Sequence, residues 1–447
     1  MFNKDFKWGA ATASAQIEGG YKAADRTPSV WDVASNYKYS NLIFNNHTSH
    51  VTCDHYNRVE EDVKLMKEIG LTAYRFSISW TRLIPNGVGK VSEEGLKFYN
   101  KLIDELIKND IIPYITIFHW DYPQSLLEQG GWLNPESTKW FEEYATKCVE
   151  LFSDRVTNFM TMNEPECFIN LGYIAKRQAP YYDLPMEVVF KIQHNVLLAN
   201  GLAINSMRKH AKQDIKIGVA FAQGGYIPVS DKEEDIKAAY DAFFDNSGDE
   251  FWGNWFVNTI LTGKYDERKL QRFGDSISYN KNDMEIIKQK LDFIGVNQYI
   301  GSHVKMGSNG KYEIIDFLNT DYTAMDWPVA SEGLYWTCKM LYEKYKVPIY
   351  ITENGVALSE WPDLDGNIVD NSRIKYVHDH LVAIEKAFKE GVDIKGYFYW
   401  SLMDNFEWTH GNSKRFGLIR VNFETGERML KSSAYWYRDL IKSSTKK

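Results

Sequence analysis

Eight short apolar or β-branched runs, most of them followed by a stretch with helical periodicity, constrain the fold of this chain more than any other feature. Strands that alternate with crossover helices form a parallel sheet with the helices outside it. Eight such units without a break in composition predict an α/β fold, a single (β/α)8 TIM barrel. The runs lie at residues 8–13, 73–79, 113–118, 158–162, 216–221, 293–298, 348–352 and 395–400.

The helical stretches support this interpretation. One of them, at residues 60–69, stops at Gly70, where a C-terminal glycine is expected. The 447 residues give an average of about 56 per unit, whereas a bare βαβ unit needs roughly 30. We therefore expect long βα loops, one domain spanning residues 1–447, and a site at the C-terminal ends of the strands. The other stretches lie at residues 95–108, 137–152, 186–209, 333–345 and 374–389.

Charge and composition exclude several classes of protein. The net charge of −8 argues against nucleic acid or an anionic membrane surface as the main partner. The sequence has no run of about 18 apolar residues and no apolar leader, so we expect neither a membrane span nor a secretion signal. Its four cysteines show no close pairing, which favours a reducing compartment and a cytoplasmic location.

Two of the predicted strands end in a glutamate. Glu164 precedes Pro165, which lacks the N–H that a central strand needs. Glu353 is followed closely by Gly355, which permits a sharp turn. Both carboxyl groups are therefore expected to face the mouth of the barrel, from roughly opposite sides.

Two carboxyl groups that face each other across a pocket are the machinery of glycosidic bond cleavage. One must be kept protonated near neutral pH and the other must stay ionised. A separation of about 5–5.5 Å indicates retention of configuration and about 6.5–9.5 Å inversion, which the sequence leaves open. The aromatic content of 15% fits a pocket for a ligand with apolar faces, such as a sugar.

A series of motifs in a fixed order carries a resemblance to a known family. They include Thr161–Pro165 around the first glutamate and Ile351–Gly355 around the second. The chain resembles glycoside hydrolase family 1, the β-glucosidase family, over nearly its whole length. The matching segments are residues 6–19, 74–80, 119–121, 161–165, 295–299, 351–355, 399–408 and 415–418.

The resemblance implies a retaining mechanism with no metal and no organic cofactor. It assigns Glu164 as the general acid/base and Glu353 as the nucleophile, with Arg75 and Tyr299 in contact with the nucleophile. An adjacent arginine holds a carboxylate ionised. For the substrate it implies Trp327 as a platform for the leaving group, together with Gln16, His119, Trp120, Asn163, Asn297, Trp400, Glu407 and Trp408.

The function that follows is a retaining β-glycosidase. It would hydrolyse terminal non-reducing β-D-glucosyl residues from oligosaccharides or small glycosides, with galactosyl and fucosyl residues left open. One alternative is a 6-phospho-β-glycosidase, in which the family typically has serine at the position of Glu407. Glu407 opposes this, because a carboxylate repels a phosphate. The other alternative is an inactive sugar-binding relative, which the presence of both Glu164 and Glu353 opposes. The oligomeric state, including a homo-oligomer, stays open.

The chain departs from the family pattern at three places on the outer side of the expected pocket. These are Glu166 and residues 178–181 and 409–412, and they leave the preferred leaving group open. If the carboxylate of Glu166 lies close to Glu164, it would raise the proton affinity of Glu164. This hypothesis predicts that Glu166→Gln moves the alkaline limb of the pH–rate profile downward.

Overall fold

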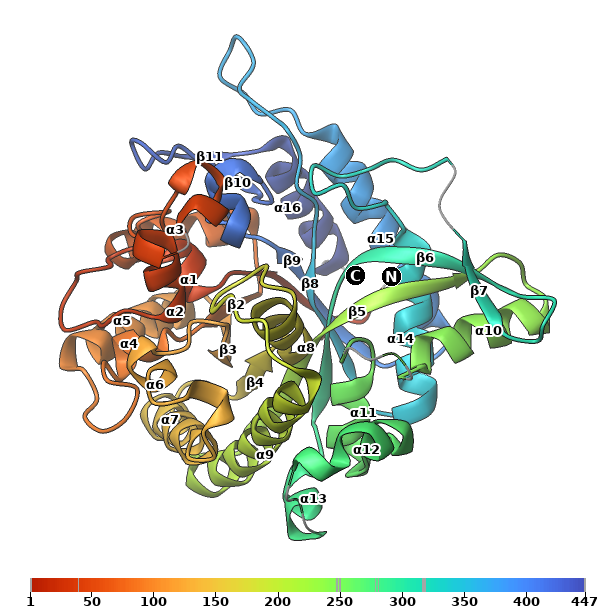
Figure 1. The fold of residues 1–447 in the computed structure, drawn as a ribbon. Coiled ribbons are helices and arrows are strands. Elements are labelled where there is room, and N and C mark those ends of the chain that lie inside the picture. The colour runs from red at the N-terminus through yellow and green to blue at the C-terminus, as the bar shows by residue number, and fades with distance from the viewer. Residues whose placement is uncertain are drawn as a thin grey trace.

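Eight parallel strands close into a ring in the computed structural model, which describes residues 2–38, 40–246, 248, 251–277, 279, 281–315 and 319–445 (Figure 1). Around the ring the order is β1-β2-β3-β4-β5-β6-β8-β9, and β9 pairs with β1. This confirms the predicted barrel and all eight predicted strands. The strands are β1 (Lys7–Ala11), β2 (Ala73–Ser77), β3 (Ile112–Phe118), β4 (Asn158–Asn163), β5 (Lys216–Pro228), β6 (Phe293–Met306), β8 (Ile349–Asn354) and β9 (Ile394–Trp400).

Helices surround the ring and connect successive strands (Figure 1). Local signals set their ends: the Ser92 hydroxyl caps α5 by accepting a hydrogen bond from the Gly95 N–H, and α3 stops at Gly70, whose φ is 77°. All six predicted helical stretches are present. The connecting and final helices are α3 (His55–Ile69), α5 (Glu93–Lys108), α7 (Ser137–Phe152), α9 (Met186–His210), α14 (Ser331–Tyr345), α15 (Asn371–Lys389) and α16 (Ser432–Thr445).

Several elements lie outside this regular alternation. Among its described residues the connection from β5 to β6 carries four α-helices, and these two strands run past the barrel as a ribbon that β7 extends in antiparallel pairing (Figure 1). A second small sheet joins β10 to β11. The remaining α-helices and strands are α1 (Ser14–Ile17), α2 (Val30–Val33), α4 (Trp80–Leu83), α6 (Gln124–Leu127), α8 (Pro165–Ile169), α10 (Glu233–Phe244), α11 (Trp255–Thr262), α12 (Glu267–Phe273), α13 (Lys281–Ile287), β7 (Tyr312–Ile315), β10 (Ile419–Val421) and β11 (Arg428–Leu430).

Large aromatic side chains fill the interior of the barrel. Tyr114, Tyr350 and Phe398 pack together there, and the hydroxyls of Tyr114 and Tyr350 lie 3.2 Å apart. Glycine makes room for them: a Cβ at Gly9 would lie 2.5 Å from the Phe398 ring. Because side chains pack the interior, a ligand has to bind at an end of the barrel. In this fold that end is the one formed by the C-terminal ends of the strands. None of the described helices combines the length and apolarity that crossing a membrane requires.

Candidate active site

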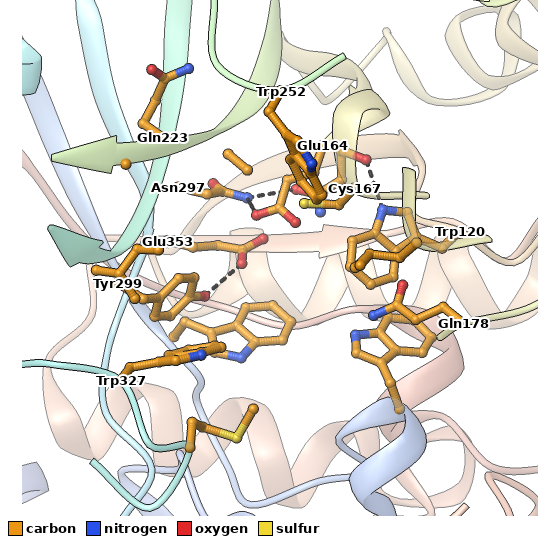
Figure 2. Close-up of a pocket in the computed structure, with 18 of the residues that line it drawn as sticks. Trp120, Glu164, Cys167, Gln178, Gln223, Trp252, Asn297, Tyr299, Trp327 and Glu353 are labelled. Carbon is orange, nitrogen blue, oxygen red and sulfur yellow. Dashed lines mark hydrogen bonds between the residues drawn. The ribbon is translucent and has the colours of Figure 1, made fainter. Parts of the chain in front are cut away.

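A cavity of about 570 Å³ opens at the C-terminal ends of the strands (Figure 2). All of the predicted site residues line it except Arg75 and Gln16, which lie behind it and hydrogen-bond to residues of its wall. The predicted residues in the wall are His119, Trp120, Asn163, Glu164, Asn297, Tyr299, Trp327, Glu353, Trp400, Glu407 and Trp408.

A change of backbone conformation at the end of β4 aims Glu164 into the cavity. β4 ends at Asn163, and Pro165 is the first residue of α8. Between them Glu164 adopts a left-handed conformation, with φ 45°, and its N–H donates to the Ala220 carbonyl oxygen at 2.8 Å. A non-glycine residue at positive φ is uncommon and costs free energy, and such residues cluster at functional sites.

Glu353 is the penultimate residue of β8 and is held from two directions. Its Oε1 accepts a hydrogen bond from Arg75 Nη1 at 2.6 Å, and its Oε2 accepts one from the Tyr299 hydroxyl at 2.7 Å. Arg75 itself is fully buried on β2. Burial of this ion pair makes its mutual attraction stronger than that of a surface pair.

Amide groups link the supports of the two carboxyl groups, and Figure 2 shows the first link, from Asn297 to Glu164. Asn297 Nδ2 donates to Glu164 Oε1 at 2.8 Å and lies 2.9 Å from Asn163 Oδ1. The same Asn163 oxygen accepts from Arg75 Nη2 at 2.6 Å. The arginine that holds Glu353 and the amide that holds Glu164 therefore meet on one atom.

The two carboxyl groups have different electrostatic surroundings. Burial, and then the charge of Glu353, raise the pKa of Glu164 to about 7. Burial raises the pKa of Glu353 as well, but the Arg75 guanidinium and the Tyr299 hydroxyl oppose that rise. Glu353 is thus the member of the pair that keeps its charge, and Glu164 is the member that holds the proton near neutral pH.

Polar and aromatic groups face each other at the far end of the cavity. Gln16 Nε2 lies 3.4 Å from Glu407 Oε2, and burial followed by the charge of Glu353 raises the pKa of Glu407 to about 8. The rings of Trp120 and Trp408 are 4.8 Å apart, between centroids. Among the described residues, neither Gln16 Oε1 nor His119 Nδ1 has a hydrogen-bond partner. Such an arrangement offers hydroxyl-binding groups beside apolar faces, which suits a sugar ring.

Several residues of the cavity wall were not among the sequence predictions. Cys167 lies three residues after Glu164 in α8, and its thiol lowers the pKa of the Glu164 carboxyl group against the larger effects of burial and of the charge of Glu353. Gln223 on β5 and Trp252 in the connection between α10 and α11 lie on the same side of the cavity (Figure 2). Only the spacing of Cys167 was a signal that the sequence could have given.

Glu166 lies next to Glu164 but is oriented differently. One carboxyl oxygen of Glu166 accepts a hydrogen bond from the Ala222 N–H, and the other has no partner among the described residues. Burial, and then the charge of Glu164, raise the pKa of Glu166 well above its usual range. Glu166 is not among the main causes of the raised pKa of Glu164, which are burial and the charge of Glu353, so an effect of Glu166 on the proton affinity of Glu164 stays a prediction.

Metal-binding side chains do not gather in this site: across the described ranges, no three His, Cys, Asp or Glu residues lie close enough together to hold an ion. The buried pair of carboxyl groups and its donors define the class of site as one for acid/base and nucleophilic chemistry on a neutral, polar ligand.

Comparison with known proteins agrees with this class. Residues 1–446 match the family model described as Glycosyl hydrolase family 1, and the chain belongs to that family. It is 42% identical to β-glucosidase A of Thermotoga maritima, over 99% of this chain and 98% of the relative, and 40% identical to β-glucosidase A of Acetivibrio thermocellus, with the same coverage of each.

Solved structures show the same likeness. The β-glucosidase from Thermotoga maritima in complex with glucoimidazole superposes with a TM-score of 0.89, at 41% identity and with 99% of each chain covered. A relative with another printed activity, the aryl-phospho-β-D-glucosidase BglC of Bacillus subtilis, is 35% identical over 99% of this chain and 98% of its own.

Proposed function

We propose that this chain is a retaining β-glucosidase in which Glu353 is the nucleophile and Glu164 the general acid/base. The observation that carries the proposal is the unequal environment of the two buried carboxyl groups. A cation and a hydroxyl donate to Glu353, whereas Glu164 receives one amide donor and the charge of Glu353. Such a pair holds one proton, on Glu164, in the neutral range.

In the first step a carboxylate oxygen of Glu353 attacks the anomeric carbon of the glucosyl residue. The bond from that carbon to the leaving oxygen breaks, and the proton of Glu164 moves to the leaving oxygen. Glu353 loses its negative charge when its oxygen forms the ester bond. Because that charge is one cause of the raised pKa of Glu164, forming the bond makes Glu164 more acidic while it donates its proton.

In the second step Glu164, now a carboxylate, takes a proton from water. The water oxygen attacks the anomeric carbon, the ester bond to Glu353 breaks, and glucose leaves with its original β configuration. At the end Glu164 holds the proton again and Glu353 its charge. Arg75 and Tyr299 hydrogen-bond to Glu353 and are therefore positioned to stabilise its negative charge as that charge forms again.

The glycone end of the cavity supports an unphosphorylated sugar. Gln16 and Glu407 supply donors and acceptors for hydroxyl groups, and Trp400 supplies an apolar face. Glu407 carries a carboxyl group at the place where a phosphate would need a cation, so the activity printed for the Bacillus subtilis relative is the less favoured candidate.

We further propose that residues 1–447 act as one catalytic domain in the cytoplasm. All eight barrel strands belong to one closed sheet, and the described cysteines are free thiols, three of them buried. Unpaired cysteines are typical of a reducing compartment.

The test is the initial rate on p-nitrophenyl β-glucoside, β-galactoside, β-fucoside, α-glucoside and β-glucoside 6-phosphate. We expect release from unphosphorylated β-sugars, its loss in Glu353→Ala, and β-glucose as the first product by NMR. Release from the phosphorylated sugar alone would contradict the role given to Glu407. Activity that survives in Glu353→Ala would contradict the proposed nucleophile.

A further inference from the structure

The loop that follows β9 folds back on itself where it carries two residues of the cavity wall, Glu407 and Trp408. The Glu407 N–H donates to the Gly411 carbonyl oxygen at 2.7 Å, and the His410 N–H donates to the Glu407 carbonyl oxygen at 2.8 Å. Residues 407–413 are called here the glycone loop. The backbone of Glu407 is therefore placed by the direction in which the Gly411 carbonyl points.

One peptide group in the glycone loop, which joins Gly411 to Asn412, is held from both of its sides. Its carbonyl oxygen accepts the hydrogen bond from Glu407, and its N–H donates to His47 Nδ1 at 3.0 Å. Because a peptide group is a rigid plane, the bond to His47 fixes the direction of the carbonyl that meets Glu407. Hydrogen bonds in series through one peptide group also strengthen each other.

Gly411 would leave this peptide group free to rotate if His47 did not hold it. The φ of 54° and ψ of −138° at Gly411 lie in a region that favours glycine, and glycine has no side chain to restrain the backbone there. A Cβ at this position would lie 2.6 Å from His47 Nδ1, so the imidazole ring lies directly against the glycine. The restraint on the Gly411 carbonyl therefore comes from His47.

His47 reaches the glycone loop from a distant part of the sequence. It lies half-buried in the connection from α2 to α3, and the Phe44 ring packs against it edge-on, with 5.7 Å between the centroids. His47 itself lies outside the wall of the cavity, so it can act on a bound sugar only through the glycone loop. The stretch that it holds, residues 409–412, is one of the places where the chain departs from the family pattern.

The carboxyl group of Glu407 has a separate support. Gln16 Nε2 lies 3.4 Å from Glu407 Oε2 and donates to the Phe406 carbonyl oxygen at 2.9 Å. Gln16 thus holds the side chain of Glu407 and the start of the loop, whereas His47 holds the backbone from the other side. A rotation of that backbone would displace the carboxyl group from a bound sugar, and small displacements of a positioned group cost activity.

We propose that His47 is a positioning residue for the glycone. It holds the peptide group between Gly411 and Asn412 and thereby places the carboxyl group of Glu407 against the hydroxyls of the sugar. The inference rests on the proposed β-glucosidase function, in which Glu407 binds those hydroxyls. The departure at residues 409–412 then concerns the glycone as well as the leaving group.

The experiment compares two substitutions of His47 by kcat/KM on p-nitrophenyl β-glucoside. His47→Leu removes the acceptor for the Asn412 N–H, and we expect kcat/KM to fall roughly 2- to 12-fold, the factor for one lost hydrogen bond. His47→Asn supplies a side-chain oxygen that can accept in place of Nδ1, and it should stay within about 2-fold of the wild type. A residue that only fills space would not be rescued in this way.

A double-mutant cycle tests the route through Glu407. In a Glu407→Ala background, His47→Leu should cause no further fall, because the carboxyl group that it places is gone. Gly411→Ala pushes a methyl group against His47 and should lower kcat/KM in the same way, which keeps the test open if His47→Leu does not fold. His210→Leu is the matched control: His210 Nδ1 lies 2.9 Å from the Ser206 carbonyl oxygen at the end of α9, and kcat/KM should not change.

The outcomes that would overturn the role of His47 differ from the one that would overturn the proposed function. An unchanged rate in His47→Leu, an equal fall in His47→Asn, or the full fall repeated in the Glu407→Ala background would overturn the positioning role and leave the function standing. Absence of wild-type release from every unphosphorylated β-glycoside would overturn the proposed function itself, and the role of His47 with it.

Discussion

Removing the hydroxyl of Tyr299 tests how the charge of Glu353 is held. This hydroxyl donates to Glu353 Oε2 at 2.7 Å, and the Tyr299 ring lies 5.4 Å from the Trp327 ring, between centroids. Tyr299→Phe keeps the ring contact and deletes the donor. A hydrogen bond to a charged group contributes about 1.5–3 kcal/mol, and 1.36 kcal/mol corresponds to one pKa unit. The pKa of Glu353 should therefore rise by about 1 to 2 units.

The sign follows from the role of Glu353. The hydroxyl lowers the pKa of Glu353, so its removal favours the protonated form, which cannot act as a nucleophile. The acid limb of kcat/KM against pH should move upward by about 1 to 2 units, while the alkaline limb, set by Glu164, should stay near pH 7. The bell-shaped profile thus becomes narrower from the acid side.

The assay is the pH dependence of kcat/KM for an aryl β-glucoside. Tyr114→Phe is the matched control, because its hydroxyl lies 3.2 Å from that of Tyr350 inside the packed barrel, away from the carboxyl pair. Its acid limb should not move. An unmoved or lowered acid limb in Tyr299→Phe, with the protein folded, would refute the argument that this hydroxyl holds the charge of Glu353.

Three further substitutions test other parts of the argument. Glu164→Gln should abolish the alkaline limb of the pH–rate profile. In steady-state assays it should lower kcat/KM by roughly 10²- to 10⁴-fold, and the decrease should be larger for substrates with poor leaving groups than for nitrophenyl glucosides. Glu166→Gln should leave the alkaline limb in place, because burial raises the pKa of Glu166 and so favours its neutral form; a downward shift of the limb would show that Glu166 carries a charge that acts on Glu164. Arg373→Met should lower the free energy of unfolding by about 3–5 kcal/mol in urea denaturation, since it leaves the buried carboxylate of Asp370 without its cation and Glu360 with Lys431 alone. A loss below about 1 kcal/mol would count against this ion-pair network.

The sequence predicted the barrel because its signal is repeated in every unit. Apolar runs alternating with helical periodicity leave few arrangements, and the ends of the runs placed Glu164 and Glu353 at the mouth. The predictions stopped β5 at Phe221 and β6 at Gln298, whereas the strands continue to Pro228 and Met306. Beyond the barrel the residues of β5 alternate between buried and half-exposed, and most of those of β6 are half-exposed, a weaker pattern than a run that is buried throughout.

The same limit applies to the site. Asn163 and Asn297 were predictable because they adjoin strand ends in motifs with a fixed order. Trp252 comes from a connection within the β5–β6 insertion, and nothing in the local sequence determines how far it lies from Glu164. Gln223 follows a predicted strand, but its lack of a partner becomes visible only when every neighbour is placed.

Glu164 and Glu353 lie at two similar strand ends, and their different roles depend on the closed ring of strands. Glu164 follows the buried strand β4 and Glu353 lies at the end of the buried strand β8, and nothing in their immediate sequence separates an acid from a nucleophile. The distinction comes from across the barrel: Arg75 reaches Glu353 from β2, three places around the ring from β8, and Asn297 reaches Glu164 from β6, two places from β4. Asn163 Oδ1 accepts hydrogen bonds from both Arg75 and Asn297. A change in the hydrogen bonds that hold one carboxyl group therefore also changes those that hold the other. The chemistry of the pair is therefore a property of the closed barrel, in which residues distant in sequence fix which carboxyl group holds the proton.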